Sequence, residues 1–110
     1  MTIKLRFDAN PEWAGSRVWT EEPSLAPVAG LLDFDLQTAA SARRWLQKLK
    51  DVVSGKMAPF EGVGNGYRCA ISPSHSEVSL NMDDDPGTVT VATTDLAGAV
   101  EEWAEYLEGL

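Results

Sequence analysis

The chain opens with alternating apolar and charged residues. Within residues 2–8, Ile3, Leu5 and Phe7 occupy every second position, and charged side chains lie between them. Successive side chains of a strand point to opposite faces, so this spacing predicts a strand with one apolar face.

Four further alternating segments follow in the second half of the chain. The connections between them are short, and one contains Asn65-Gly66, a dipeptide that two-residue hairpins favour. Short connections favour antiparallel pairing, and the alternation predicts a sheet with one buried face and one solvated face. The predicted strands cover residues 57–63, 67–71, 77–82 and 88–92.

A helix is predicted over residues 36–54, where apolar side chains recur at steps of three and four residues. Asp33 or Asp35 is the expected N-terminal cap, and Gly55 is the expected left-handed residue that ends the helix. The buried stripe is predicted to contain Leu36, Ala39, Ala42, Leu46, Leu49 and Val53, widened by Trp45 and Val52.

A second helix is predicted from Thr94 or Asp95, either of which can cap it, to about residue 108. Its apolar residues form one clean stripe, and glutamates fill the outer surface. The stripe contains Leu96, Ala99, Val100, Trp103, Leu107 and Leu110, and the acidic surface contains Glu101, Glu102, Glu105 and Glu108.

Residues 9–34 follow neither pattern. Prolines and glycines interrupt this segment, so we expect it to be irregular, with at most a short edge strand at residues 17–20. Trp13 and Trp19 lie within it. These side chains either cover part of the core as a lid or anchor a partner, a role in which tryptophan is enriched.

These elements predict a single α+β domain over residues 1–110. An antiparallel sheet of four to five strands would carry the two amphipathic helices on one face, in the order β-α-β-β-β-β-α. A length of 110 residues fits one domain with one hydrophobic core.

The charge of the chain restricts its ligands. Seventeen acidic and nine basic residues give a formal net charge of −8. Direct binding to nucleic acid or to an anionic membrane is disfavoured, because both are bound through cationic side chains. A basic protein partner is attracted instead, and its encounter is accelerated. Solubility alone is the competing explanation.

The remaining composition points to the cytoplasm. Cys69 is the only cysteine and cannot form an internal disulfide, and no apolar run reaches the ~20 residues of a membrane span. The first residues lack the continuous apolar stretch of a signal peptide. We therefore expect a cytoplasmic protein that is a monomer or a weak dimer when free.

Side chains suited to catalysis are few. His75 is the only histidine and is expected in a solvated turn, without the carboxylate and the nucleophile that a catalytic relay needs. Cys69 is expected to be a buried, inert thiol. The glycines of residues 62–66 resemble a phosphate-binding loop, but a strand follows them where such a loop needs a helix, so a hairpin is favoured. We expect no catalytic residue and no cofactor.

Three consecutive aspartates, Asp83, Asp84 and Asp85, are predicted to form the tip of a hairpin. Clustered carboxylates suit calcium or magnesium, yet no further acidic ligand follows at the spacing of a calcium loop. We expect no bound metal here. The same carboxylates could accept hydrogen bonds from lysine and arginine side chains of a partner.

A helix bearing tryptophan and leucine leads into Gly55-Lys56, and Thr94-Asp95-Leu96 later opens a helix that contains Trp103. Between them lie a glycine-rich hairpin, a Val78-Ser79-Leu80 strand and an acidic turn. The hairpin reads Phe60-Glu61-Gly62-Val63-Gly64-Asn65-Gly66-Tyr67-Arg68-Cys69-Ala70-Ile71.

This arrangement, over residues 35–110, resembles small bacterial immunity proteins, in particular those of contact-dependent growth inhibition systems. Members of that class bind and neutralise the C-terminal toxin domain, commonly a nuclease, that a sibling cell delivers. The resemblance implies a cytoplasmic inhibitor without cofactor or catalytic residues. A nuclease toxin is cationic where it binds phosphates, so an acidic inhibitor would complement it.

The leading hypothesis is therefore an immunity protein that occludes the active site of a basic toxin domain. One alternative is an acidic interaction or regulatory subunit without a toxin partner, and another is a metal-dependent hydrolase that uses the aspartates. The predicted partner-binding residues are Glu77, Asp83, Asp84, Asp85, Trp13, Trp19, Glu101 and Glu105.

Overall fold

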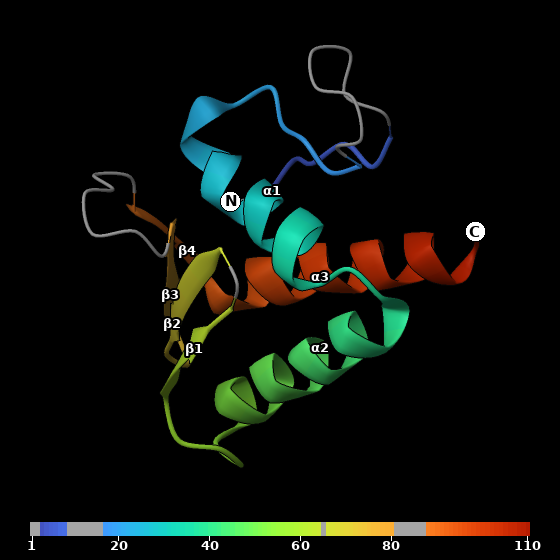
Figure 1. The fold of residues 1–110 in the computed structure, drawn as a ribbon. Helices are drawn as coiled ribbons and strands as arrows, with labels where there is room; N and C mark the ends of the chain where they lie inside the picture. The colour runs from blue at the N-terminus through green and yellow to red at the C-terminus, as the bar shows by residue number, and fades with distance from the viewer. Residues whose placement is uncertain (1–2, 9–16, 65, 81–87) are drawn as a thin grey trace.

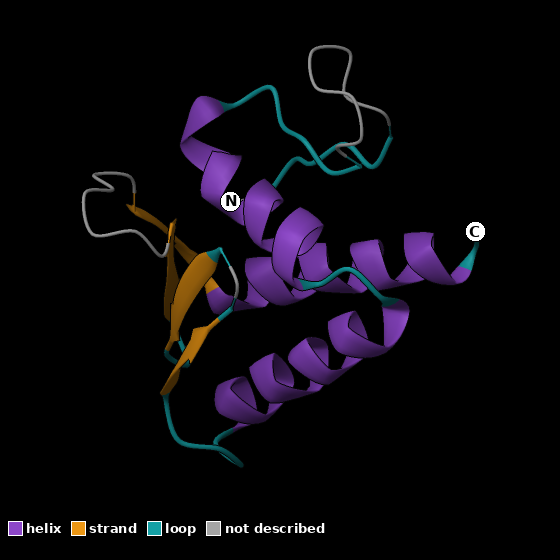
Figure 2. Cartoon of the chain, viewed as in Figure 1, coloured by secondary structure: helices purple, strands orange, loops and turns teal. Residues whose placement is uncertain are grey.

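The computed structural model describes residues 3–8, 17–64, 66–80 and 88–110. Within these residues the chain forms an antiparallel sheet with helices packed on one side of it, which confirms the α+β class (Figures 1 and 2). The elements are η1 (Pro23–Leu25), α1 (Ala26–Gly30), η2 (Leu31–Asp35), α2 (Ala39–Ser54), β1 (Phe60–Val63), β2 (Tyr67–Ile71), β3 (His75–Leu80), β4 (Thr88–Ala92) and α3 (Thr93–Glu108).

The sheet is a meander in the order β1-β2-β3-β4, with every neighbouring pair antiparallel, as the short connections predicted. Its two faces differ as expected from the alternation. In the centre of the sheet Cys69 pairs with Val78, and both side chains are fully buried, whereas Arg68 and Glu77 on the other face are exposed. Figure 2 shows the helices gathered beside one face of the sheet.

The β1–β2 connection is a hairpin. The Gly64 N–H donates to the Tyr67 carbonyl at 2.8 Å, and β2 follows directly, so this glycine-rich stretch does not lead into a helix as a phosphate-binding loop would. Its glycines permit close packing, because a Cβ built on Gly62 would lie 2.8 Å from the Trp45 ring. Asn65 lies outside the described residues.

The strand predicted at residues 2–8 does not join the sheet within the part of the chain that the structure describes. There, residues 3–8 form one isolated bridge, in which Arg6 and Trp19 exchange N–H to carbonyl hydrogen bonds of 2.7 and 3.0 Å. The alternation was nevertheless informative, since Ile3 is buried and Leu5 and Phe7 pack against the core. An alternating pattern determines which side chains face the core, but it does not determine which backbone the segment pairs with.

The prediction of an irregular segment is wrong for residues 23–34, which lie in an unbroken series of helical turns, η1, α1 and η2. Pro23 and Pro27 each lie in the first turn of their element. Proline is tolerated there because its missing N–H has no helical partner to satisfy. The segment supplies a large part of the core through Leu25, Val28, Ala29, Leu31 and Leu32.

Helix α2 begins later than predicted and uses a different cap. Thr38 and Ser41 form a capping box, in which the Ser41 N–H donates to the Thr38 hydroxyl at 3.1 Å. Neither Asp33 nor Asp35 caps this helix. Gly55 does end it in the left-handed conformation, with φ of 84°, as predicted.

Helix α3 is also capped differently from the prediction. Ala92 is at the N-cap and makes no side-chain cap, so Thr94 and Asp95 do not have that role. The Thr93 hydroxyl instead donates to the Ser72 carbonyl at 2.5 Å and lies 2.7 Å from the Ser76 hydroxyl. This buried pair joins the start of α3 to the turn between β2 and β3.

Helices α2 and α3 lie antiparallel and pack against each other beside the sheet (Figure 1). Trp103 of α3 is fully buried, and its indole N–H donates to the Leu36 carbonyl at 2.7 Å. Trp45 of α2 is half-buried against Phe60. Val53 and Leu110 of the predicted stripes are exposed instead of buried, at 39% and 77%.

Candidate functional site

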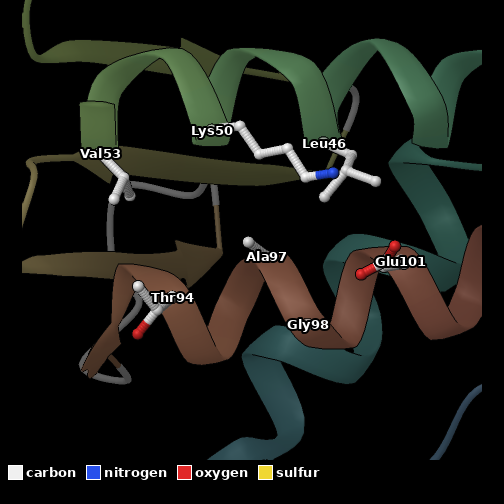
Figure 3. A pocket seen from close by; sticks show the side chains of 7 residues that line it. All are labelled: Leu46, Lys50, Val53, Thr94, Ala97, Gly98 and Glu101. Carbon is white, nitrogen blue, oxygen red and sulfur yellow. The ribbon is translucent and has the colours of Figure 1, made fainter. Parts of the chain in front are cut away.

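A groove of about 260 Å³ runs between α2 and α3 on the surface of the protein (Figure 3). It forms because large side chains of α2 lie opposite small residues of α3, so the two helices do not fill the space between them. Leu46, Lys50 and Val53 line it from α2, and Thr94, Ala97, Gly98 and Glu101 line it from α3.

The floor of the groove is apolar. Leu46 is buried at its base, while Val53 remains 39% exposed although it belongs to the apolar stripe predicted for α2. Gly98 leaves the opposite side open, since a Cβ built on it would meet no atom within 4 Å. An exposed apolar depression of this kind is a common feature of ligand and protein contact sites.

Opposite charges lie on the two sides of the groove. Figure 3 shows Lys50 extending from α2 and Glu101 on α3. Within the described part of the chain, neither side chain forms an ion pair. Both charges can therefore contact a molecule that enters the groove.

Glu101, Glu105 and Glu108 follow one another at helical spacing on α3, and all three raise the pKa of Arg43 on α2. The largest cause is the hydrogen bonding of Glu108, whose oxygens accept from the Arg43 Nε and terminal nitrogen at 3.0 and 2.6 Å. The same contact lowers the pKa of Glu108. Since Arg43 neutralises Glu108, Glu101 and Glu105 are the carboxylates of this row that remain for a partner.

The structure brings only part of the predicted partner-binding set together. Glu101 and Glu105 lie one turn apart on α3. Glu77 is exposed on β3, on the face of the sheet that points away from the helices, so it does not share a surface with them. Trp13, Asp83, Asp84 and Asp85 lie outside the described residues.

Trp19 is held within the N-terminal segment. Its indole N–H donates to the Asp8 carboxylate at 2.6 Å, and the Arg6 guanidinium lies 5.2 Å from the centre of its ring. The side chain is half-buried. Its contacts therefore join residues 6–8 to residue 19 and leave one part of the ring surface exposed.

The groove itself was not predicted from the sequence. Its lining includes Leu46 and Val53 of the predicted stripe, and three residues for which the pattern predicts no binding role, Lys50, Ala97 and Gly98. A glycine inside a strong helical pattern was the available signal, because glycine costs a helix about 1 kcal/mol relative to alanine and marks a position where a side chain is absent.

The two side chains considered for catalysis have ordinary surroundings. His75 is exposed, and its Nδ1 lies 3.0 Å from the Ser74 hydroxyl. It is the first residue of β3 and not part of the turn, a correction of the prediction. Cys69 is buried as predicted, and burial raises the pKa of its thiol to about 12. A protonated, buried thiol is a poor nucleophile.

Among residues 3–8, 17–64, 66–80 and 88–110, no group of three or more histidine, cysteine, aspartate or glutamate side chains is arranged to hold a metal ion. The helices in the same part of the chain are too short or too polar to cross a membrane. No protein-family model, curated protein or solved structure matches this chain. The resemblance to immunity proteins stays a prediction.

Proposed function

We propose that this protein is an immunity protein, which binds a basic toxin domain in the cytoplasm and neutralises it. The observation that carries the proposal is a pair of carboxylates on α3: Glu101 is half-buried in the lining of the apolar groove, and Glu105 is exposed one turn further along the helix. Neither forms an ion pair with a described residue. Carboxylates next to an apolar depression suit a partner that presents both cationic and apolar side chains.

The net charge of −8 supports the same partner. Complementary charge raises the rate of encounter and excludes acidic competitors, and the buried apolar contact slows dissociation. An inhibitor of this kind needs a stable surface and no reactive group. The exposed His75 and the buried Cys69 are consistent with that requirement.

The test begins with the product of the adjacent upstream open reading frame. If the proposal is correct, that product is toxic when expressed alone, and co-expression of this chain restores growth and yields a complex that co-purifies. A product that is harmless, or one that this chain neither binds nor neutralises, would overturn the proposal.

Charge reversal then examines the surface. The double variant Glu101→Lys, Glu105→Lys is expected to slow association at least tenfold at low salt, because it replaces two carboxylates with repelling cations. Glu77→Lys is the matched control, since it makes the same kind of change on the opposite face of the sheet. Equal association rates for the double variant and the control would remove α3 from the interface.

A further inference from the structure

The groove between α2 and α3 is large enough for a side chain of a partner. Its volume is about 260 Å³, whereas an engineered apolar protein cavity of ~150 Å³ accommodates benzene. Leu46, Val53, Ala97 and Gly98 give it an apolar lining. One aromatic or large aliphatic side chain therefore fits, in contact with both helices.

The charges around the groove favour a particular charge on the partner residues that flank the inserted side chain. Glu101 is at one end of the lining and Glu105 follows one turn later. Both carboxylates interact electrostatically with Arg43, but neither forms an ion pair with a described cation. Lys50 lies on the opposite side of the groove. A partner cation is attracted to α3 and repelled from α2, which favours one orientation of the partner in the groove.

The spacing of these features matches a helix. Ala97 and Glu101 are four residues apart on α3, about one helical turn or ~5.4 Å along the axis. A second helix presents an apolar residue at position i and a cation at position i+4 with the same separation. Helices that bind in grooves through residues at i and i+4 are a recurrent mode of recognition.

We propose that the groove binds a basic amphipathic helix of the partner, which inserts one large apolar side chain over Ala97 and Gly98 and places a lysine or arginine one turn away against Glu101 and Glu105. This inference rests on the proposed function for the basic character of the partner, and it adds the binding mode and the anchor position.

The probe is a synthetic helical peptide of about 18 residues, long enough to sustain a helix. It carries one tryptophan with arginines four residues before and after it. Binding is followed through the backbone amide NMR signals of the full chain. We expect saturable shifts at Leu46, Val53, Ala97 and Gly98, at peptide concentrations below about 1 mM.

Two variants of the protein separate the groove from the general charge. Gly98→Phe places a ring in the groove and should weaken binding at least tenfold, whereas Gly98→Ala adds one methyl group and should weaken it far less. A peptide in which alanine replaces tryptophan should lose binding to the same degree as Gly98→Phe. Glu77→Gln should leave the affinity unchanged, since Glu77 lies on the opposite face of the sheet.

The inference is overturned if the peptide causes no shifts at about 1 mM, if the shifts lie on the open face of the sheet, or if Gly98→Phe binds as well as the unchanged chain. These outcomes are separate from failure of the proposed function. A chain that neutralises a toxin equally well with phenylalanine at position 98 is an immunity protein that does not use this groove. If the chain binds the peptide but neutralises no toxin, the groove is a binding site for a basic helix and the proposed immunity function is wrong.

Discussion

The Asp35 carboxylate accepts a hydrogen bond of 3.0 Å from the backbone N–H of Tyr67, a residue 32 positions away in the sequence. Its other oxygen accepts from the Gly66 N–H at 3.2 Å. Asp35 is the last residue of η2, and Tyr67 is the first residue of β2. One carboxylate thus attaches the helical segment to the β1–β2 hairpin.

Replacement of Asp35 should destabilise the protein, because it leaves two partly buried N–H groups without their acceptor. We expect Asp35→Ala to lower the free energy of unfolding by about 2 kcal/mol and Asp35→Asn, which retains one acceptor, by about 1 kcal/mol. Urea denaturation followed by circular dichroism measures both. Glu102→Ala is the control, since this glutamate is exposed on α3, and a loss as large as that of Asp35→Ala would contradict the assignment.

Gly98→Ala should stabilise the protein by about 0.5–1 kcal/mol, because glycine is a poor helix former and a Cβ at this position meets no atom within 4 Å. Gly62→Ala should have the opposite sign and cost about 1–3 kcal/mol, because its Cβ would lie 2.8 Å from the Trp45 ring. Thermal and urea unfolding of both variants, compared with the unchanged chain, measures the sign of each change in stability. Destabilisation by Gly98→Ala would mean that the groove is filled in the folded protein.

Cys69 should react with a thiol reagent only when the protein unfolds. Burial raises the pKa of its thiol to about 12, so the thiol stays protonated in the folded state at pH 8 and above. The unfolded thiol ionises near pH 9, hence folding stability contributed by this group falls as the pH rises above that value. Labelling with and without denaturant measures the protection of the thiol. The urea midpoints of the unchanged chain and of Cys69→Ala, compared between pH 8 and 10, measure the loss of stability with rising pH.

The contact between Arg43 and Glu108 should contribute little to the stability of the folded protein, and this contribution should be present only above acidic pH. It lowers the pKa of Glu108, so its stabilisation is present above the ordinary carboxyl pKa near 4.5 and is lost as the pH falls through the lower pKa of the folded state. The unfolding midpoints of the unchanged chain and Glu108→Gln should differ at pH 7 and converge in acid. High salt should also reduce the difference, because both side chains are solvent-exposed.

Periodicity was sufficient to predict the sheet and the two long helices. Apolar residues alternate from Tyr67 to Ile71, and this spacing places them on one face only if the segment is a strand. The apolar residues of α3 recur at steps of three and four, and this spacing places them on one face only if the segment is a helix. Gly55 was predictable for the same kind of local reason, because few other residues adopt positive φ.

The remaining errors involve choices that depend on distant residues. Prolines at positions 23 and 27 predict an irregular segment, but each lies in a first helical turn that the core contacts of Leu25 and Val28 stabilise. Asp35 has the sequence context of a helix cap, but its carboxylate accepts hydrogen bonds from Gly66 and Tyr67 of the β1–β2 hairpin. The sequence predicts that hairpin, but nothing near Asp35 indicates that the two segments meet. The groove arises from the packing of two helices against each other, so neither helical pattern contains it.

The indole of Trp103 and the carbonyl of Leu36 are 67 residues apart in the chain. A nascent chain that has completed α1, α2 and the sheet still lacks the ring that fills the centre of the core and satisfies that carbonyl. Folding must therefore wait for a long-range closure, which slows it relative to a protein built from local contacts. Any fragment that stops before α3 would expose to solvent the apolar face of α2, the helix that α3 packs against, and become a substrate for aggregation or proteolysis.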